Sequence, residues 1–380
     1  MFNFLKKQPV EFYILVIVPI IWITALIIFN PVFLSNLRIL TLQSAGFYAF
    51  FGGPFFQLGF FILYNYLIAK ACFFLKDLWQ LKRAKQKISF AFFYPHLKSW
   101  ALIFLPIGLA GFVNSLAATS LSLAPADKVA AASVLINQWD YKIFGVYTAF
   151  WIQQFSGWLT DVLLINAYIG LTAILPAIFL GLLIFKKTRF RQFMLAILIA
   201  PMLGYPFWYI WPAVSPNEMF RYNVTKTVVP ANIQNEIASF SLTEKQKEFD
   251  DSIEDFWIDK TGNTFAVTAF PSMHAAWGII AAYFGVLLWK PLAIILIPWA
   301  ILNSLGAIYT FQHYGVDMIL GTIVGILAIA IAIFLLRFEK KYLCPKPQTF
   351  LMIDTFQNDC RSFIKFLRNF FFKILKMPTE

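Results

Sequence analysis

Long apolar runs alternate with short polar or charged connections along most of the chain. A transmembrane helix needs roughly 20 mainly apolar residues, and eight segments meet that requirement. They lie at residues 13–29, 46–69, 99–121, 162–185, 192–210, 272–289, 291–311 and 314–336. The connection between the last two is so short that it must be a tight turn at the membrane surface. The pattern predicts an all-α polytopic membrane protein with about eight transmembrane helices and both termini on the same side.

The composition agrees with this pattern and excludes several classes of protein. Of the 380 residues, 60% are hydrophobic and 13% are charged, whereas soluble domains have about 25% charged residues. Disordered chains, collagen-like repeats and soluble globular domains are therefore excluded, and three cysteines form no disulfide framework. The first apolar run follows Lys6 and Lys7 as in a signal sequence. Because it ends at Asn30 and Pro31 without a small-residue cleavage pattern, we interpret it as an uncleaved first span.

The net charge of +12 is unevenly distributed along the chain. Residues 70–98, 186–191 and 337–380 carry net charges of +6, +4 and +5, whereas the long connection 212–270 carries −4. Because cytoplasmic segments collect Lys and Arg, the three basic segments and both termini are predicted to be cytoplasmic. The connection 212–270 then faces the periplasm or a lumen, and the bacterial inner membrane is the expected location. The charge excess thus reports membrane sidedness, and we expect no nucleic-acid partner.

Two further segments have an interfacial character. Residues 361–376 mix phenylalanines with basic residues, which predicts a helix on the anionic cytoplasmic leaflet; a solvated basic tail is the alternative. Residues 139–158 are rich in aromatic side chains, which predicts a helix lying in the outer interface.

Two of the three histidines lie at predicted helix ends. His274 follows Pro271 and Ser272 at the start of the sixth span, where proline fits the first turn and serine can cap it. A helix N-terminus attracts anions, so this segment predicts an anion site with a hydroxyl and an imidazole attached. The alternative is an ordinary capped membrane helix. The third histidine, His96, is interpreted as a surface residue of the basic loop.

His313 lies four residues before Asp317 at the start of the eighth span. This spacing places both side chains on one helical face, where the carboxylate can orient the imidazole and leave its second nitrogen free as a nucleophile or base. A helix-capping ion pair, or a pair inside a transporter, is the alternative. His274 and His313 are 39 residues apart, close to two membrane crossings, so both are expected at the same membrane face.

Two imidazoles, a carboxylate and a helix N-terminus suit phosphoryl transfer. One histidine attacks phosphorus while the other protonates the leaving oxygen, and cations stabilise the charge on the phosphoryl oxygens. Arg221 and Lys226 are the nearest cations in the predicted outer connection. The sequence contains no carboxylate cluster for two metals and no glycine-rich nucleotide loop.

These motifs resemble the type 2 phosphatidic acid phosphatase superfamily, which shares a helical core with vanadium haloperoxidases. Its Pro-Ser-x-His block matches residues 271–274, and its His-x-x-x-Asp block matches His313 and Asp317. The resemblance implies that His313 forms a phosphohistidine, that Asp317 orients it, that His274 is the general acid and that Ser272 helps to hold phosphate. It also implies catalysis without a metal or other cofactor.

The chain departs from the ordinary phosphatases in its basic residues. It has no Arg-Pro dipeptide, and Ala307 stands where an arginine is expected six residues before the nucleophile. The His-Tyr-x-x-Asp form of the last block is similar to inositol phosphorylceramide synthases and sphingomyelin synthases. The proline pair in residues 212–216 and the aromatic stretch that begins at Trp139 and Asp140 also resemble the inositol phosphorylceramide synthase-like branch. The resemblance covers residues 135–335.

The resemblance divides the chain into three predicted regions. Residues 1–134 hold N-terminal transmembrane helices and a basic cytoplasmic loop, residues 135–336 form the phosphatase-like catalytic membrane domain with outer loop 212–270, and residues 337–380 form a basic amphipathic cytoplasmic tail.

We expect a membrane-embedded lipid phosphatase or phosphotransferase that acts on a lipid phosphate or phosphodiester at the outer face through a phosphohistidine. Residues 217–268 are predicted to cover its site and select headgroups. A headgroup transferase of the inositol phosphorylceramide or sphingomyelin synthase type stays open, because the sequence does not decide whether water or a lipid hydroxyl accepts the phosphoryl group. Two further alternatives are a proton-coupled transporter and a zinc site made from His274, His313 and Asp317.

Overall fold

A computed structural model describes residues 18–29, 31–38, 123–221, 241–257 and 268–343, together with isolated positions elsewhere. The described segments are helical and contain no strand, which confirms the predicted all-α class. The chain divides into two units. One comprises Met1–Trp22, Ala45–Ser115 and Arg337–Glu380, and the other comprises Ile23–Ser44 and Leu116–Leu336. The second unit contains both histidine motifs.

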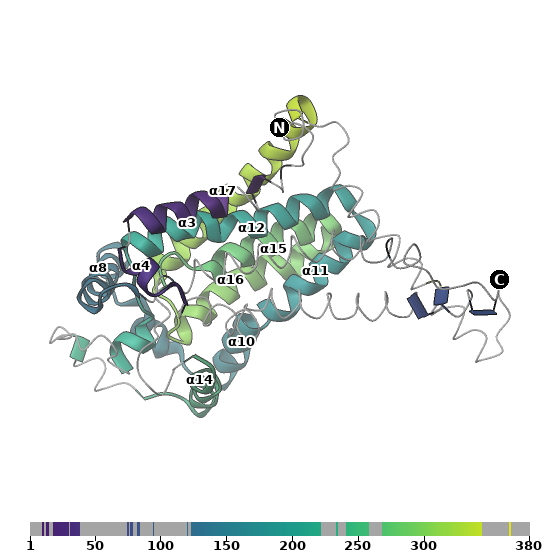
Figure 1. Cartoon of the computed structure of the whole chain (residues 1–380). Coiled ribbons are helices and arrows are strands. Elements are labelled where there is room, and N and C mark those ends of the chain that lie inside the picture. The colour runs from purple at the N-terminus through teal and green to yellow at the C-terminus, as the bar shows by residue number, and fades with distance from the viewer. Residues whose placement is uncertain are drawn as a thin grey trace. The chain divides into compact units, whose positions relative to one another are not determined.

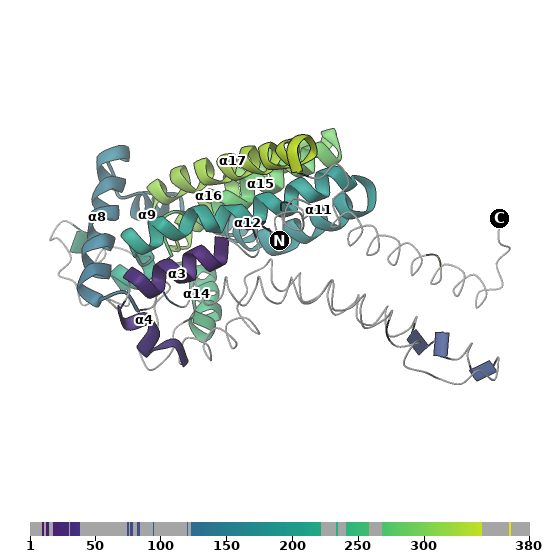
Figure 2. The same ribbon diagram turned by 45° about the horizontal axis from the view of Figure 1, so that its top comes forward.

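The second unit is a bundle of long apolar helices (Figures 1 and 2). In chain order, its helices are α8 (Ala126–Phe144), α9 (Thr148–Trp151), α10 (Trp158–Ile169), α11 (Leu171–Phe185), α12 (Lys187–Ile210), α15 (Met273–Leu288), α16 (Ala293–Tyr309) and α17 (Gly315–Phe338). Helix α15 packs against α11, α12 and α16, and α16 also packs along α10. Short elements complete the unit: α4 (Pro31–Ser35), a 3-10 turn η3 (Ile152–Phe155), a π-helical turn η4 (Asn217–Arg221), α14 (Glu244–Trp257) and a 3-10 turn η5 (Lys290–Leu292).

Helix α3 (Val18–Phe29) begins in the first unit and ends in the second, and a π-helical turn η6 (Glu339–Leu343) follows α17 in the first unit. Within the first unit, the backbone N–H of Val10 donates to the buried carboxylate of Glu339 at 3.0 Å. This bond joins the N-terminal segment to the chain that follows α17.

Among the described helices, three are long and apolar enough to cross a membrane: Thr188–Ile210, Lys290–Tyr309 and Gly315–Tyr342. They contain most of the predicted spans 192–210, 291–311 and 314–336, and the protein is a membrane protein. Helix α15 is apolar but shorter. The predicted span 46–69 lies outside the described residues, 99–121 lies almost entirely outside them, and 13–29 is described only in part, so a total of eight spans stays a prediction.

The predicted span 162–185 is interrupted by a bend in the structure. Helices α10 and α11 meet at Gly170 with a bend of 46°. Glycine is a poor helix former, and the hydroxyl of Thr172 donates to the carbonyl of Ile169 at 2.7 Å, which takes one acceptor away from the regular backbone ladder. The break therefore has a local cause that an apolar run does not reveal.

The aromatic stretch 139–158 is not the single helix that the sequence predicted. Helix α8 ends at Phe144, and Gly145 adopts a left-handed backbone conformation with φ of 73° while its N–H donates to the carbonyl of Tyr141. Such a C-terminal glycine stops a helix because it reverses the chain direction without a side-chain clash. Helix α9 and η3 follow as separate short elements. The amphipathic tail 361–376 lies almost entirely outside the described residues.

Candidate functional site

The two predicted histidine motifs meet where α15 and α17 begin. His313 lies in the turn between α16 and α17, and its backbone N–H donates to the carbonyl of Ala307 at 3.2 Å. The turn is sharp because Phe311 adopts a φ of 57°, which bulky residues rarely do. The ring of Phe311 packs edge-on against Phe150 at 5.6 Å, and its carbonyl accepts a hydrogen bond from the backbone N–H of Asn217 at 2.9 Å. These contacts hold the turn that presents His313.

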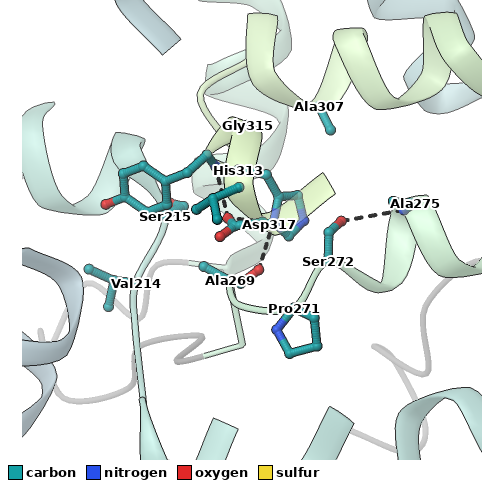
Figure 3. A network of polar contacts seen from close by, with 12 residues as sticks. Val214, Ser215, Ala269, Pro271, Ser272, Ala275, Ala307, His313, Gly315 and Asp317 are labelled. Atoms are coloured by element: carbon teal, nitrogen blue, oxygen red, sulfur yellow. Dashed lines mark hydrogen bonds and ion pairs between the residues drawn. The ribbon is translucent and has the colours of Figure 1, made fainter. Parts of the chain in front are cut away.

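The imidazole of His313 is held at one nitrogen (Figure 3). Its Nδ1 lies 3.0 Å from the carbonyl oxygen of Ala269 and 3.4 Å from Oδ2 of Asp317. A carbonyl oxygen can only accept, so Nδ1 carries the proton in the neutral ring and Nε2 keeps its lone pair. The residue is 6% exposed. The arrangement leaves Nε2 as the nucleophilic atom.

Burial also sets the charge of this imidazole. Desolvation lowers the pKa of His313 from 6.5 to about 4, although the hydrogen bond to Ala269 opposes the shift. The ring is therefore neutral near pH 7. A neutral imidazole can attack phosphorus, whereas a protonated one cannot.

Asp317 is fully buried in the first turn of α17. Its Oδ2 accepts a hydrogen bond from the backbone N–H of Tyr314 at 2.8 Å, and its Oδ1 has no hydrogen-bond partner within the described part of the chain. Its backbone carbonyl accepts from the N–H of Ser272 at 3.2 Å. Asp317 therefore links the two motifs, because its side chain faces His313 and its backbone carbonyl binds the start of α15.

Ser272 is the N-cap of α15 and is fully buried. Its Oγ accepts a hydrogen bond from the backbone N–H of Ala275 at 3.4 Å, so the hydroxyl proton is available to donate (Figure 3). A phosphoryl oxygen at the N-terminus of α15 can accept that proton and interact with the positive end of the helix dipole.

His274 lies beside His313. The centroids of the two imidazole rings are 5.6 Å apart, and the rings are inclined at 62°. Tyr168 of α10 stacks on His274 with a centroid distance of 4.5 Å and an interplanar angle of 29°. The carbonyl of His274 accepts a hydrogen bond from Nδ2 of buried Asn303 at 3.2 Å, which ties α15 to α16. The structure therefore brings together all four residues assigned to the two motifs.

A buried carboxylate that the motifs did not predict caps α17. Oδ1 of Asp140 accepts from the N–H of Val316 at 3.0 Å, while its Oδ2 accepts from the N–H and the hydroxyl of Thr148 at 2.8 and 2.7 Å. Oγ1 of Thr148 in turn accepts from the N–H of Gly315 at 2.9 Å. Burial raises the pKa of Asp140, and these hydrogen bonds act in the opposite direction. Together they fix the backbone between His313 and Asp317.

The proline segment 212–216 supports the other side of the site. The carbonyl of Ala213 accepts from the N–H of Ala269 at 3.2 Å, so the residue that holds Nδ1 of His313 is itself paired with this segment. Nε1 of Trp208 donates to the carbonyl of Pro271 at 3.2 Å. The proline pair noted in the sequence thus helps to place the carbonyl that orients the nucleophile.

The predicted cations are not placed at the site. The backbone of Arg221 ends η4, but its side chain and the whole of Lys226 lie outside the described residues. Ala307 is fully buried on α16 (Figure 3), so the position where the resemblance leads us to expect an arginine offers a methyl group. Among the described side chains, no group of three His, Cys, Asp or Glu residues could hold a metal ion, and this includes the set His274, His313 and Asp317.

Comparison with known families finds a match for the part of the chain that contains both histidine motifs. Residues 144–331 match the model of the PAP2 superfamily, the family of type 2 phosphatidic acid phosphatases. Through this part, the chain belongs to the PAP2 superfamily. The match contains both histidine motifs, and it assigns the protein to the phosphatase and phosphotransferase type of enzyme. No curated protein and no solved structure matches the chain significantly. Its position within the superfamily stays a prediction.

Three parts of the site were missed by sequence reasoning. Ala269 acts through its backbone carbonyl, which leaves no signal in a side-chain pattern. Asp140 was noticed only as part of an aromatic stretch, although a lone acidic residue in an apolar context indicates a buried partner. Tyr168 is one of 15 tyrosines and has no motif around it.

Proposed function

We propose that this PAP2 superfamily member cleaves or transfers the phosphoryl group of a lipid phosphate or phosphodiester at the outer face of the membrane. The observation that carries the proposal is the geometry of His313: its Nδ1 is held by Ala269 and Asp317, its Nε2 has no hydrogen-bond partner among the described residues, and a second imidazole lies at a ring distance of 5.6 Å. A single oriented histidine could be structural. A nucleophile beside a proton donor is a catalytic arrangement.

The reaction proceeds in two steps. Nε2 of His313 attacks phosphorus while the bond from phosphorus to the leaving oxygen breaks, and His274, protonated when the anionic phosphate is bound beside it, gives its proton to that oxygen. A water or lipid hydroxyl then attacks the phosphohistidine, His274 takes the proton back, and the phosphorus–nitrogen bond breaks. Ser272 and the N-terminus of α15 stabilise the phosphoryl oxygens, with Arg221 and Lys226 as the proposed cations.

A matched pair of variants tests this function. The purified protein should release phosphate from phosphatidic acid in the presence of EDTA, and His313→Ala should reduce that release by at least about a thousandfold because the nucleophile is lost. The control is Gln312→Ala, since this neighbouring side chain donates to the carbonyl of Thr310. Unchanged phosphate release by His313→Ala contradicts the mechanism.

The burial of the site supports headgroup transfer as a second candidate. Ser272 and Asp317 are fully buried and His313 is nearly so, which restricts the access of water to a phosphohistidine. A lipid hydroxyl that fills the site would then be the preferred acceptor. Adding ceramide or diacylglycerol to a phospholipid donor should yield a new phospholipid at the expense of free phosphate. Hydrolysis that is insensitive to either acceptor would favour the phosphatase.

A further inference from the structure

The orientation of His274 depends on packing. Its ring nitrogens have no hydrogen-bond partner within the described part of the chain, in contrast to Nδ1 of His313. The ring contacts Tyr168 face to face at 4.5 Å and His313 edge to face at 5.6 Å. A flat aromatic neighbour restricts rotation of an imidazole about χ2 while leaving both nitrogens available for proton transfer.

Tyr168 is itself supported by a helix of the long connection 212–270. Phe249 of α14 packs edge-on against Tyr168, with a centroid distance of 5.7 Å and an interplanar angle of 80°. Phe249 is buried, and α14 packs beside α10 (Figure 1). A chain of ring contacts therefore runs from the predicted outer connection through Tyr168 to His274.

Hydrogen bonds to the bundle fix the position of α14. The hydroxyl of Thr243 donates to the buried Asp161 at 3.1 Å, just before the helix begins. Nε2 of Gln246 donates to Oε1 of Gln153 at 2.8 Å and to the carbonyl of Tyr309 at 3.2 Å. A surface helix with a loose attachment would not make buried contacts of this kind, so α14 forms part of the site's framework.

A further bond joins α14 to the segment that follows the proline pair. Nδ2 of Asn217 donates to Oδ1 of Asp250 at 2.7 Å, and both residues are buried. The backbone N–H of Asn217 also donates to the carbonyl of Phe311, in the turn that presents His313. Helix α14 is thus anchored to elements on both sides of the histidine pair.

We propose that Tyr168 is a positioning residue for the proton donor His274, and that Phe249 of α14 holds Tyr168 in place. The proposal rests on the proposed function, because it assigns Tyr168 to the step in which His274 protonates the leaving oxygen. It also gives the predicted outer connection a role in catalysis, since α14 supports the acid through one intermediate ring. Tyr168 acts through its ring plane and needs no hydroxyl.

Leaving-group dependence separates this role from a merely structural one. An alkyl oxygen is a poor leaving group that needs protonation, whereas a nitrophenolate leaves readily without it. A residue that acts through the general acid should therefore matter for forming the phosphohistidine from phosphatidic acid and be nearly dispensable for forming it from p-nitrophenyl phosphate. A residue that only stabilises the fold should affect both substrates equally.

The experiment compares kcat/KM for the two substrates in a set of variants, because kcat/KM reports the steps up to release of the leaving group and excludes the later step in which His274 accepts a proton. His274→Ala shows how much more activity is lost on phosphatidic acid than on p-nitrophenyl phosphate when the acid is absent. Tyr168→Ala should show a smaller difference of the same sign, with a loss at least about tenfold larger on phosphatidic acid than on p-nitrophenyl phosphate. Tyr168→Phe keeps the ring and should retain wild-type selectivity. Phe249→Ala, like Tyr168→Ala, should lose more activity on phosphatidic acid than on p-nitrophenyl phosphate. Tyr283→Ala, an exposed tyrosine on the helix that carries His274, should change neither substrate.

The outcomes test the role of Tyr168 separately from the assignment of His274 as the acid and from the proposed function. Equal losses on both substrates in Tyr168→Ala, or loss of selectivity in Tyr168→Phe, overturn the positioning role while leaving the phosphohistidine chemistry intact. If His274→Ala itself fails to discriminate between the substrates, the assignment of the acid is wrong and the role of Tyr168 fails with it. If the wild-type protein turns over neither substrate, the proposed function is overturned first.

Discussion

At the scale of single residues, Nδ1 of His313 has two partners, a side-chain carboxylate and a backbone carbonyl. The carbonyl of Ala269 lies closer to Nδ1 of His313 than Oδ2 of Asp317 does, at 3.0 Å against 3.4 Å. The carboxylate also accepts from the backbone N–H of Tyr314, so it orders the turn as well as the ring. The expected role of Asp317 in orienting His313 is therefore shared with a backbone group, and Asp317→Asn should impair catalysis less than His313→Ala does.

The lowered pKa of His313 predicts a pH-dependent stability. In the unfolded chain the imidazole takes up a proton below its ordinary pKa of 6.5, whereas the folded protein resists protonation until about pH 4. Unfolding therefore becomes more favourable as the pH falls through this window, and the stabilising contribution is fully present only above 6.5. The thermal midpoint in detergent should fall with acidification more steeply for the wild type than for His313→Asn. Parallel curves for the two proteins would contradict the assigned burial.

Asp140 is predicted to stabilise the turn that carries the nucleophile. Asp140→Ala leaves the N–H groups of Val316 and Thr148 without their buried acceptor, which should cost about 2–4 kcal/mol of unfolding free energy and most of the activity. Asp127→Ala is the matched control, because Asp127 is an exposed residue in the first turn of the same helix. Denaturant unfolding and phosphate release, measured on both variants, check the prediction. Equal stability of the two variants would show that the cap is dispensable.

At the scale of elements, the site depends on how closely α17 approaches the start of α15. A Cβ atom on Gly321 would lie 2.2 Å from the carbonyl oxygen of Ser272 and 3.1 Å from Cβ of Ala275. Neither atom belongs to a flexible side chain that could move aside. The N–H of Ser272 donates to the carbonyl of Asp317 across the same contact. Glycine at this position therefore permits the two motifs to meet.

Gly321→Ala should push the two helices apart and disrupt the site. A displacement of about 1 Å at a catalytic pair can reduce the rate about a hundredfold, so we expect a loss of that order in kcat. Gly157→Ala is the control, since its backbone is extended with φ of 168° and a Cβ there meets no atom within 4 Å. Phosphate release by both variants, normalised to the folded fraction, decides the question. Near-normal activity of Gly321→Ala would argue against close contact between the motifs.

The elements also show which parts of the fold the sequence could predict. Apolar runs located the helices α12, α16 and α17, because a lipid environment demands long uninterrupted apolar segments. The 39-residue spacing predicted that His274 and His313 lie at the same membrane face, and in the structure their rings are 5.6 Å apart. The break at Gly170 could not be foreseen in the same way, since it depends on the competition between a threonine hydroxyl and the backbone ladder.

Contacts between distant segments were the hardest to predict. Asp140 and Val316 are far apart in sequence, and nothing in either segment specifies that a carboxylate of α8 caps α17. Likewise, Gln246 lies in a polar helix whose sequence gives no sign of its contact with Gln153. Periodicity describes one helix at a time, whereas these bonds arise only when helices pack. The assignment of α14 to the framework of the site therefore needed the structure.

At the scale of the whole molecule, the uneven charge predicts a topology that labelling can test. Cys72, Cys344 and Cys360 all lie in segments predicted to be cytoplasmic, whereas the exposed Asp251 lies in the connection predicted to face outward. A membrane-impermeant maleimide should therefore label Asp251→Cys in intact cells and leave the wild type unlabelled until the membrane is permeabilised. Labelling of the wild type in intact cells would contradict the predicted sidedness. The same experiment bears on the predicted number of eight spans.

The predicted sidedness also bears on how a phosphate substrate is recognised. The connection 212–270 has a net charge of −4, so the overall charge of +12 cannot attract an anionic lipid to this side. Recognition must come from local groups: Ser272, the start of α15, the two histidines and the proposed cations. The three predicted regions, 1–134, 135–336 and 337–380, stay predictions, and the PAP2 match falls within the middle one.

The central claim is that His313 forms a covalent bond to phosphorus, and trapping the intermediate tests it most directly. Wild-type protein mixed rapidly with phosphatidic acid labelled with ³²P and quenched in alkali should carry protein-bound label that is stable in base and released by acid, as expected of a phosphohistidine. Peptide mapping should place the label at His313, and His313→Ala should carry none while His96→Ala labels normally. Label at another residue, or undiminished labelling of His313→Ala, would contradict the account.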